Sequence, residues 1–100
     1  MDIQLTVYIL ECADGRFYTG STKKPIEARV WEHNHGAEDS YCARRRPVNL
    51  VFTEVYARLL EGHARERQIK GWSRKKKIAL IKRHYEALPN LSRRRVEDAD

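Results

Sequence analysis

The feature that most constrains the fold is an Asp-Gly pair set between two runs of β-branched and aromatic residues. Asp14-Gly15 separates residues 6–11 from residues 16–20. Glycine supplies the positive φ that a tight turn needs, and the flanking side chains favour extended backbone. The pattern therefore predicts a β-hairpin. Because side chains alternate along a strand, Tyr8 should point to the face opposite its two neighbours.

A helix is expected after the hairpin. Pro25 is suited to the first turn of a helix, and Ser21 or Thr22 stands upstream as a possible cap. The following residues repeat at the spacing of one helical face, and the helix should end near Gly36. The stripe on that face consists of Ile26, Arg29, Val30 and His33.

Four further segments are expected in the rest of the chain. Their patterns are typical of a polar loop, a β-strand and two helices. The last helix has a serine at its N-cap and ends before a proline. The segments are a basic loop over residues 37–47, a third strand over 48–56, a helix over 59–70, and a helix that Ser73 caps and that runs to about Leu88 before Pro89.

The resulting order, β-β-α-β-α-α, predicts an α+β domain in which helices flank a small three-stranded, mainly antiparallel sheet. The pattern does not set the direction of the third strand. A chain of 100 residues has room for one core. Residues 1–88 are therefore expected to form a single domain, and residues 89–100 a flexible tail.

The charge balance favours a polyanionic partner without naming one. Twenty Lys and Arg against 14 Asp and Glu give a net charge of +6. No apolar run approaches the roughly 20 residues of a membrane helix. The N-terminus also lacks the basic and apolar regions of a signal peptide. The protein is therefore expected to stay in the cytoplasm and not to bind membranes.

The two cysteines, Cys12 and Cys42, are far apart in the sequence and form no Cys-x-x-Cys pair. A zinc site would require both to converge with histidines such as His33 and His35. The favoured interpretation is that both are reduced thiols in a reducing compartment. The alternative is a zinc site.

Two tyrosines of the hairpin are candidates for chemistry. Tyr8 lies in the middle of the first strand and Tyr18 in the partner strand, just before Thr19-Gly20. Two phenol oxygens near one edge of a short hairpin would lie side by side. The alternative is that both are ordinary strand aromatics, chosen for their preference for extended backbone.

Arg29 and His33 are one helical turn apart, on the stripe expected to face the sheet. A partly buried arginine is costly unless an anion meets it. A phosphate would do so, because its oxygens match the guanidinium fork. The alternative is a surface arginine whose aliphatic stem covers apolar neighbours.

Glu66 is a lone acid among Arg65, Arg67 and Lys70. It is either a salt-bridged residue on a helix surface or a carboxylate ligand for Mg²⁺, a hard cation that prefers oxygen and often takes only one or two carboxylates.

Basic residues cluster in two places, before the third strand and at the start of the last helix. Together they would form a surface that follows a phosphate backbone, or else remain solvated helix and loop faces. Trp31 is either core or a platform for base stacking. The candidate nucleic-acid-binding residues are Arg44, Arg45, Arg46, Lys70, Arg74, Lys75 and Lys76.

The order of these features is more specific than any one of them. Val7-Tyr8-Ile9 and Tyr18-Thr19-Gly20, with their tyrosines ten residues apart, resemble the paired tripeptides of the GIY-YIG nuclease superfamily. Arg29 and His33 match the arginine and histidine of the family's first helix. Glu66, in the context Arg-Glu-x-x-Ile-Lys-Gly-Trp-Ser-Arg, matches its metal-binding glutamate. The resemblance is greatest to the small stand-alone bacterial (YhbQ-like) branch.

The sequence departs from the family pattern at several points. Val7 replaces the first glycine, and Thr19 fills the middle of the second tripeptide. Many members carry an asparagine downstream of the glutamate. Here that region is Lys77-Ile78-Ala79, which leaves the role unfilled.

The resemblance implies an endonuclease that hydrolyses DNA. Low sequence specificity is expected, because base readout needs a groove-filling element and none is evident in the sequence. Glu66 would hold Mg²⁺ or Mn²⁺, Arg29 would stabilise charge on the phosphoryl oxygens, and Tyr8 would position or deprotonate the attacking water. Tyr18 and His33 would orient these groups or shuttle protons. To act as a base, Tyr8 needs nearby cations to lower its pKa.

Two other functions stay open from the sequence. One is a nucleic-acid-binding module, for DNA more than RNA, with little or no catalysis. The other is a protein-interaction module whose basic surface meets an acidic partner. The sequence does not determine the oligomeric state.

Overall fold

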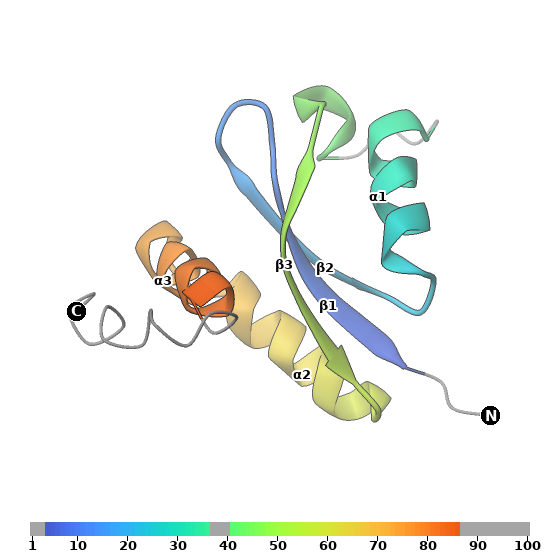
Figure 1. Cartoon of the computed structure of the whole chain (residues 1–100), viewed down its shortest axis with the longest axis vertical. Helices are drawn as coiled ribbons and strands as arrows, with labels where there is room; N and C mark the ends of the chain where they lie inside the picture. Colours follow the sequence, from blue (N-terminus) through green and yellow to red (C-terminus); the bar gives the residue numbers. More distant parts are fainter. Residues whose placement is uncertain (1–3, 37–40, 87–100) are drawn as a thin grey trace. The chain divides into compact units, whose positions relative to one another are not determined.

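The computed structural model describes residues 4–36 and 41–86 of the chain. These described residues divide into two compact units, one that ends at Lys70 and one that begins at Gly71. The predicted element order is confirmed (Figure 1). The elements are β1 (Leu5–Glu11), β2 (Phe17–Thr22), α1 (Ile26–His35), the short 3₁₀ helix η1 (Ala43–Arg45), β3 (Asn49–Tyr56), α2 (Leu59–Lys70) and α3 (Arg74–Glu86).

The single domain expected over residues 1–88 stays a prediction, and the tail expected over residues 89–100 lies outside the described residues. In the described part of the chain, no helix is both long enough and apolar enough to cross a membrane.

The sheet has the order β2-β1-β3, and both pairings are antiparallel. The direction of the third strand, which the pattern left open, is therefore antiparallel to β1. The hairpin turn closes as predicted, with Gly15 at a φ of +88° and the Cys12 amide donating to the Arg16 carbonyl over 2.8 Å. The strand β1 is central, so both of its edges are satisfied by hydrogen bonds.

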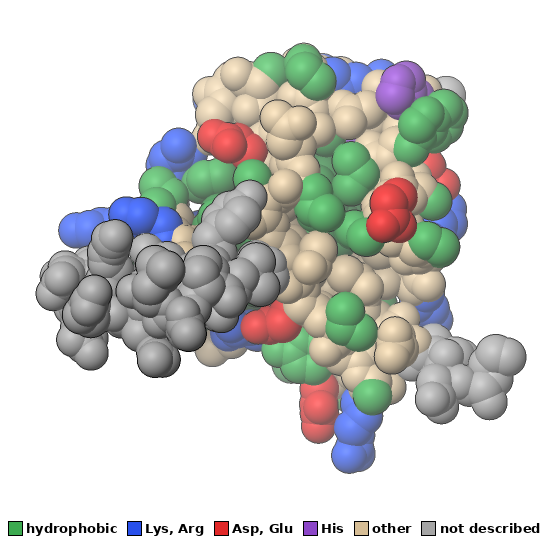
Figure 2. All heavy atoms as spheres, viewed as in Figure 1, with side chains coloured by type: hydrophobic (Ala, Val, Ile, Leu, Met, Phe, Trp, Pro, Cys, Tyr) green, Lys and Arg blue, Asp and Glu red, His purple; other side chains and the backbone are tan. Residues whose placement is uncertain are grey.

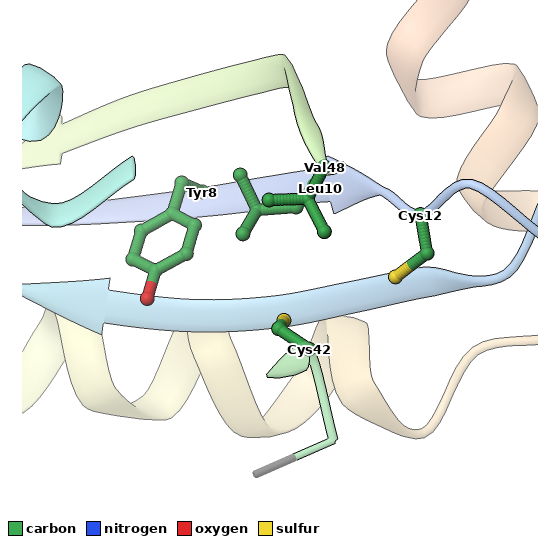
Figure 3. Packing of buried hydrophobic residues seen from close by; sticks show 5 residues of the cluster. All are labelled: Tyr8, Leu10, Cys12, Cys42 and Val48. Atoms are coloured by element: carbon green, nitrogen blue, oxygen red, sulfur yellow. The ribbon is translucent and has the colours of Figure 1, made fainter. Parts of the chain in front are cut away.

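Helix α1 lies on one face of the sheet and α2 on the other (Figure 1). On the α1 side, Tyr8 and Leu10 of β1 pack with Cys12, Cys42 and Val48, as Figure 3 shows. Both cysteines are free, buried thiols, and burial raises the pKa of the Cys42 thiol to about 11. Partly buried side chains of β2 and α1 complete this cluster: Tyr18, Ile26 and Val30.

The opposite face of β1 packs under α2. Leu5, Val7 and Ile9 alternate with the residues of the other face and are fully buried. Ile69 of α2 is also fully buried. Gly62 lets α2 lie close to the sheet. A side chain at this position would meet Leu5 and Tyr56 at close range.

The helix caps differ partly from the prediction. The Ser73 cap is confirmed, since its hydroxyl accepts a hydrogen bond from the Lys76 amide over 3.2 Å. The cap proposed for α1 is wrong. Pro25 occupies the N-cap position without a side-chain cap, and the Thr22 hydroxyl accepts from the Lys24 amide, ahead of the helix.

The close contact at Gly62 generates a test of the α2 packing. Glycine to alanine in an exposed helix stabilises a protein by about 1 kcal/mol. Here the added Cβ would lie 2.7 Å from Leu5 Cδ2 and 3.3 Å from Tyr56 Cβ. We expect Gly62→Ala to lower the free energy of unfolding by about 1–3 kcal/mol, measured by urea denaturation.

Ala64→Gly serves as the control, because Ala64 is exposed on the same helix. It should cost about 1 kcal/mol through helix propensity alone. A gain in stability for Gly62→Ala would contradict the close approach of α2 to the sheet.

Candidate active site

A buried hydrogen bond joins the sheet to α1 at the centre of the site. Tyr8 Oη lies 2.8 Å from Nε2 of His33, and both side chains are buried. The phenol donates this bond when Nε2 carries no proton, and accepts it in the other tautomer. Tyr8 reaches the histidine because the alternation of β1 turns it toward α1, where His33 lies on the inward stripe.

Gly20 makes room for the tyrosine pair. It stands directly opposite Tyr8 in the β1–β2 register. A Cβ at this position would lie 2.6 Å from Tyr8 Oη and 3.0 Å from a ring carbon of Tyr18. The ring centroids of Tyr8 and Tyr18 are 6.4 Å apart, and that of Tyr18 is 5.2 Å from His33. The glycine of the Tyr-Thr-Gly tripeptide therefore serves side-chain packing.

Arg29 approaches the phenol of Tyr8 from α1. Its Nη1 donates a 2.8 Å hydrogen bond to Glu32, whose other carboxylate oxygen accepts from Lys24 over 2.6 Å. Burial alone would lower the pKa of Arg29, but its contacts with Glu32 and Tyr8 raise that pKa above its usual value. The guanidinium is thus a permanent cation, held in place by one acidic neighbour.

The pKa of Tyr8 is raised to about 12 by burial, an effect that the Arg29 cation offsets only in part. The lowered pKa that Tyr8 would need to act as a simple base is therefore not reached in the protein alone. At neutral pH, Tyr8 is an uncharged phenol.

Glu66 lies on the other side of the sheet, on α2. The Ser21 hydroxyl donates to Glu66 Oε1 over 2.5 Å, and Lys70 Nζ lies 3.0 Å from Oε2. Burial would raise the pKa of this carboxyl, but the hydrogen bonds from Ser21 and Lys70 outweigh it and hold the pKa below its usual value. Glu66 is therefore ionised at neutral pH.

The two halves of the site meet at the edge strand β2. A pocket of about 380 Å³ opens there, with Arg29 of α1 and His63 of α2 among its walls. Ser21, the hydrogen-bond partner of Glu66, also lines it. The remaining lining residues are Leu5, Thr22, Lys23 and Lys24. A small anionic group in this pocket would meet the arginine and lie beside the residues around Glu66.

The basic residues predicted to bind nucleic acid have different surroundings. Arg46 donates to the carbonyl oxygens of His33 and Gly36, so it closes the end of α1. Arg45 donates to the Tyr41 carbonyl, and its guanidinium lies 3.9 Å from the Tyr41 ring centroid. Lys70 pairs with Glu66, as above. Arg44 is exposed on η1, and Arg74, Lys75 and Lys76 form the first turn of α3.

Of the two interpretations of Trp31, core or platform, the structure excludes the core. Its side chain is 59 % exposed and stacks on His35, with 4.6 Å between the ring centroids. Val55 of β3 is also more than half exposed. The face drawn in Figure 2 shows hydrophobic side chains over both α1 and β3.

Comparison with known proteins identifies the fold. Residues 4–79 match the model of the GIY-YIG catalytic domain. The chain belongs to the GIY-YIG family. Two similar relatives are the UPF0213 proteins of Staphylococcus aureus strains Mu3 and N315, each 47 % identical over 76 residues, or 76 % of this chain and 92 % of theirs.

The GIY-YIG fold is also present in a solved relative. The solution NMR structure of the UPF0213 protein BH0048 from Bacillus halodurans is 37 % identical, with a TM-score of 0.53 over 79 % of this chain and 83 % of that one. The expected α+β fold and the expected family branch are confirmed. GIY-YIG domains form a nuclease family, whose members act on nucleic acid and generally depend on a divalent metal.

Sequence reasoning missed several residues of this GIY-YIG site. The sequence suggests Ser21 only as a helix cap, yet it holds Glu66 from the edge strand. No sequence motif points to Glu32, which joins Arg29 to Lys24. His63 lies three residues before Glu66, a spacing that places two side chains on one helix face. That spacing is the one local pattern that could have found it.

The raised pKa of Tyr8 predicts a pH dependence of stability. Between pH 10 and pH 12 the unfolded chain releases a phenol proton that the folded protein retains, so stability falls as pH rises. From pH 9 to pH 11, wild type should lose about 1 kcal/mol more unfolding free energy than Tyr8→Phe. Denaturant titration at each pH measures the difference. Equal losses of unfolding free energy in both proteins would show that Tyr8 has the same pKa in the folded and in the unfolded chain.

Proposed function

We propose that this GIY-YIG domain is a metal-dependent endonuclease that hydrolyses phosphodiester bonds of DNA with low sequence specificity. The main support is the arrangement around the β2 edge. Arg29 lines the pocket there and interacts with Tyr8, which is in mutual contact with Tyr18 and His33. Glu66 approaches from the other face of the sheet through Ser21.

The carboxylate of Glu66 is the group that would hold a divalent cation. An ionised carboxylate is the ligand type that Mg²⁺ and Mn²⁺ prefer, and these ions often need only one or two carboxylates beside substrate phosphates. Ser21 orients Oε1, so the carboxylate is already positioned. When bound, the ion would supply charge neutralisation at the scissile phosphate.

Arg29 is proposed to bind the phosphoryl oxygens of the scissile group. Its side chain is 28 % exposed, which leaves part of the guanidinium open to the pocket. Lys23 and Lys24 line the same pocket and add positive charge. A guanidinium held in place beforehand stabilises charge that develops in the transition state without reorganising. The bond to Glu32 supplies that preorganisation.

Tyr8 and His33 are proposed to act as a pair on the attacking water. A phenol with a pKa near 12 is almost fully protonated at neutral pH. Tyr8 would therefore take a proton from water while passing its own proton to Nε2 of His33, across their 2.8 Å hydrogen bond. Tyr18, whose ring packs on His33, would hold the imidazole in the orientation that this transfer needs.

Low sequence specificity is proposed because base readout requires an element that fills a groove. Within residues 4–36 and 41–86, every helix and strand belongs to the order already described, with no further element for this task.

Backbone phosphates would be contacted by Arg44, Arg74, Lys75 and Lys76, supported by Arg45, Arg46 and Lys70. We expect the protein to act in the cytoplasm.

Glu66→Gln tests the proposed activity directly. It removes the charge and keeps the shape, so metal-dependent cutting of labelled single-stranded, duplex and branched DNA should fall by at least about 10³-fold. Glu61→Gln, an exposed acid on the same helix, should cut like wild type. If folded wild type cuts no substrate with Mg²⁺ or Mn²⁺ yet binds DNA in a salt-sensitive way, the protein is a binding module instead.

Arg29→Ala tests the proposed phosphate contact. Loss of one preorganised donor to developing charge costs roughly 10²–10³ in the cleavage rate. Arg29→Lys should recover only part of this loss, because an ammonium lacks the guanidinium fork. Arg58→Ala, which removes an exposed arginine outside the pocket, is the matched control. Equal rates for Arg29→Ala and Arg58→Ala would remove Arg29 from the mechanism.

A further inference from the structure

His63 lies beside Glu66 on the same face of α2. The two residues are three positions apart, and His63 Nδ1 lies 3.7 Å from Glu66 Oε1. The imidazole is 45 % exposed and lines the pocket, whereas the Glu66 side chain is 16 % exposed. A nitrogen donor on the pocket wall thus stands beside the carboxylate oxygen of Glu66.

The two oxygens of Glu66 have different partners. Lys70 contacts Oε2, whereas Ser21 and His63 lie at Oε1. A cation between Oε1 and the imidazole would therefore not need to displace the Lys70 ammonium. Two ligands of one divalent ion, each about 2.1 Å from it and at a right angle, are about 3 Å apart. Small side-chain rotations would close the present 3.7 Å separation to that value.

We propose that His63 is a second protein ligand of the divalent cation that Glu66 holds, and that this makes the site a mixed nitrogen–oxygen site. The inference rests on the proposed function only in that it concerns the same cation. Substrate phosphate oxygens and water would fill the remaining positions.

The ligand type has a consequence for metal preference. Imidazole binds divalent transition metals well, in an order that rises from Mn²⁺ through Co²⁺ to Ni²⁺, whereas Mg²⁺ takes oxygen ligands. His63 should therefore add affinity for Co²⁺ and very little for Mg²⁺. A role for His63 only in a helix-surface ion pair with Glu66 would not distinguish between the two metals.

The test is calorimetric titration of the folded protein with Co²⁺ alone and with Mg²⁺ alone, without nucleic acid. His63→Ala should weaken Co²⁺ binding by at least about tenfold and Mg²⁺ binding by less than about twofold. His63→Gln, which keeps a polar side chain of similar length, should behave in the same way. Glu66→Gln should weaken binding of both ions. His35→Ala, which removes an exposed histidine on α1, should bind both like wild type.

Equal weakening of both metals in His63→Ala, unchanged Co²⁺ binding, or no Co²⁺ binding by wild type would each overturn the inference. These outcomes are separable from the cleavage assay. Unchanged Co²⁺ binding in His63→Ala, with cutting that depends on Glu66, removes His63 from the metal site and leaves the nuclease standing. Weakened Co²⁺ binding in His63→Ala, with no cutting by wild type, supports the metal site and overturns the nuclease.

Discussion

The buried hydrogen bond between Tyr8 and His33 is the constraint on which the rest of the site depends. A phenol and an imidazole in a core are costly unless each finds a partner, and here each satisfies the other. The bond ties the central strand to α1. Arg46 then secures the end of that helix through two backbone carbonyls, and Gly20 leaves the space that the phenol occupies.

The edge strand β2 joins the two faces of the sheet. Its alternation turns Tyr18 and Gly20 toward α1 and Ser21 toward α2, so one short strand contributes to both halves of the site. Ser21 carries this connection to Glu66. At neutral pH the site holds a neutral phenol, a fixed cation and an ionised carboxylate, and of these three groups the cation lines the pocket at the sheet edge.

Much of the fold could be predicted because its signals are local. The Asp14-Gly15 turn, the periods of the strands and helices, and the Ser73 cap each depend on residues close in sequence. The predicted cap of α1 was wrong because a competing bond is also local. Thr22 is close enough to bond the amide of Lys24, and this local bond competes with capping. The direction of β3 depends on pairing with a distant strand, which no local pattern encodes.

By itself, the sequence determined the order of the elements, the α+β class, the GIY-YIG pattern and the candidate residues that carry it. Only the tertiary structure decided that Ser21 and His63 stand beside Glu66, that Arg46 closes α1, and that burial outweighs Arg29 in setting the pKa of Tyr8. The physical reason is range. Turns, caps and periodicity arise within a few residues, whereas desolvation and side-chain partners are set by segments that meet only when the sheet and its helices pack.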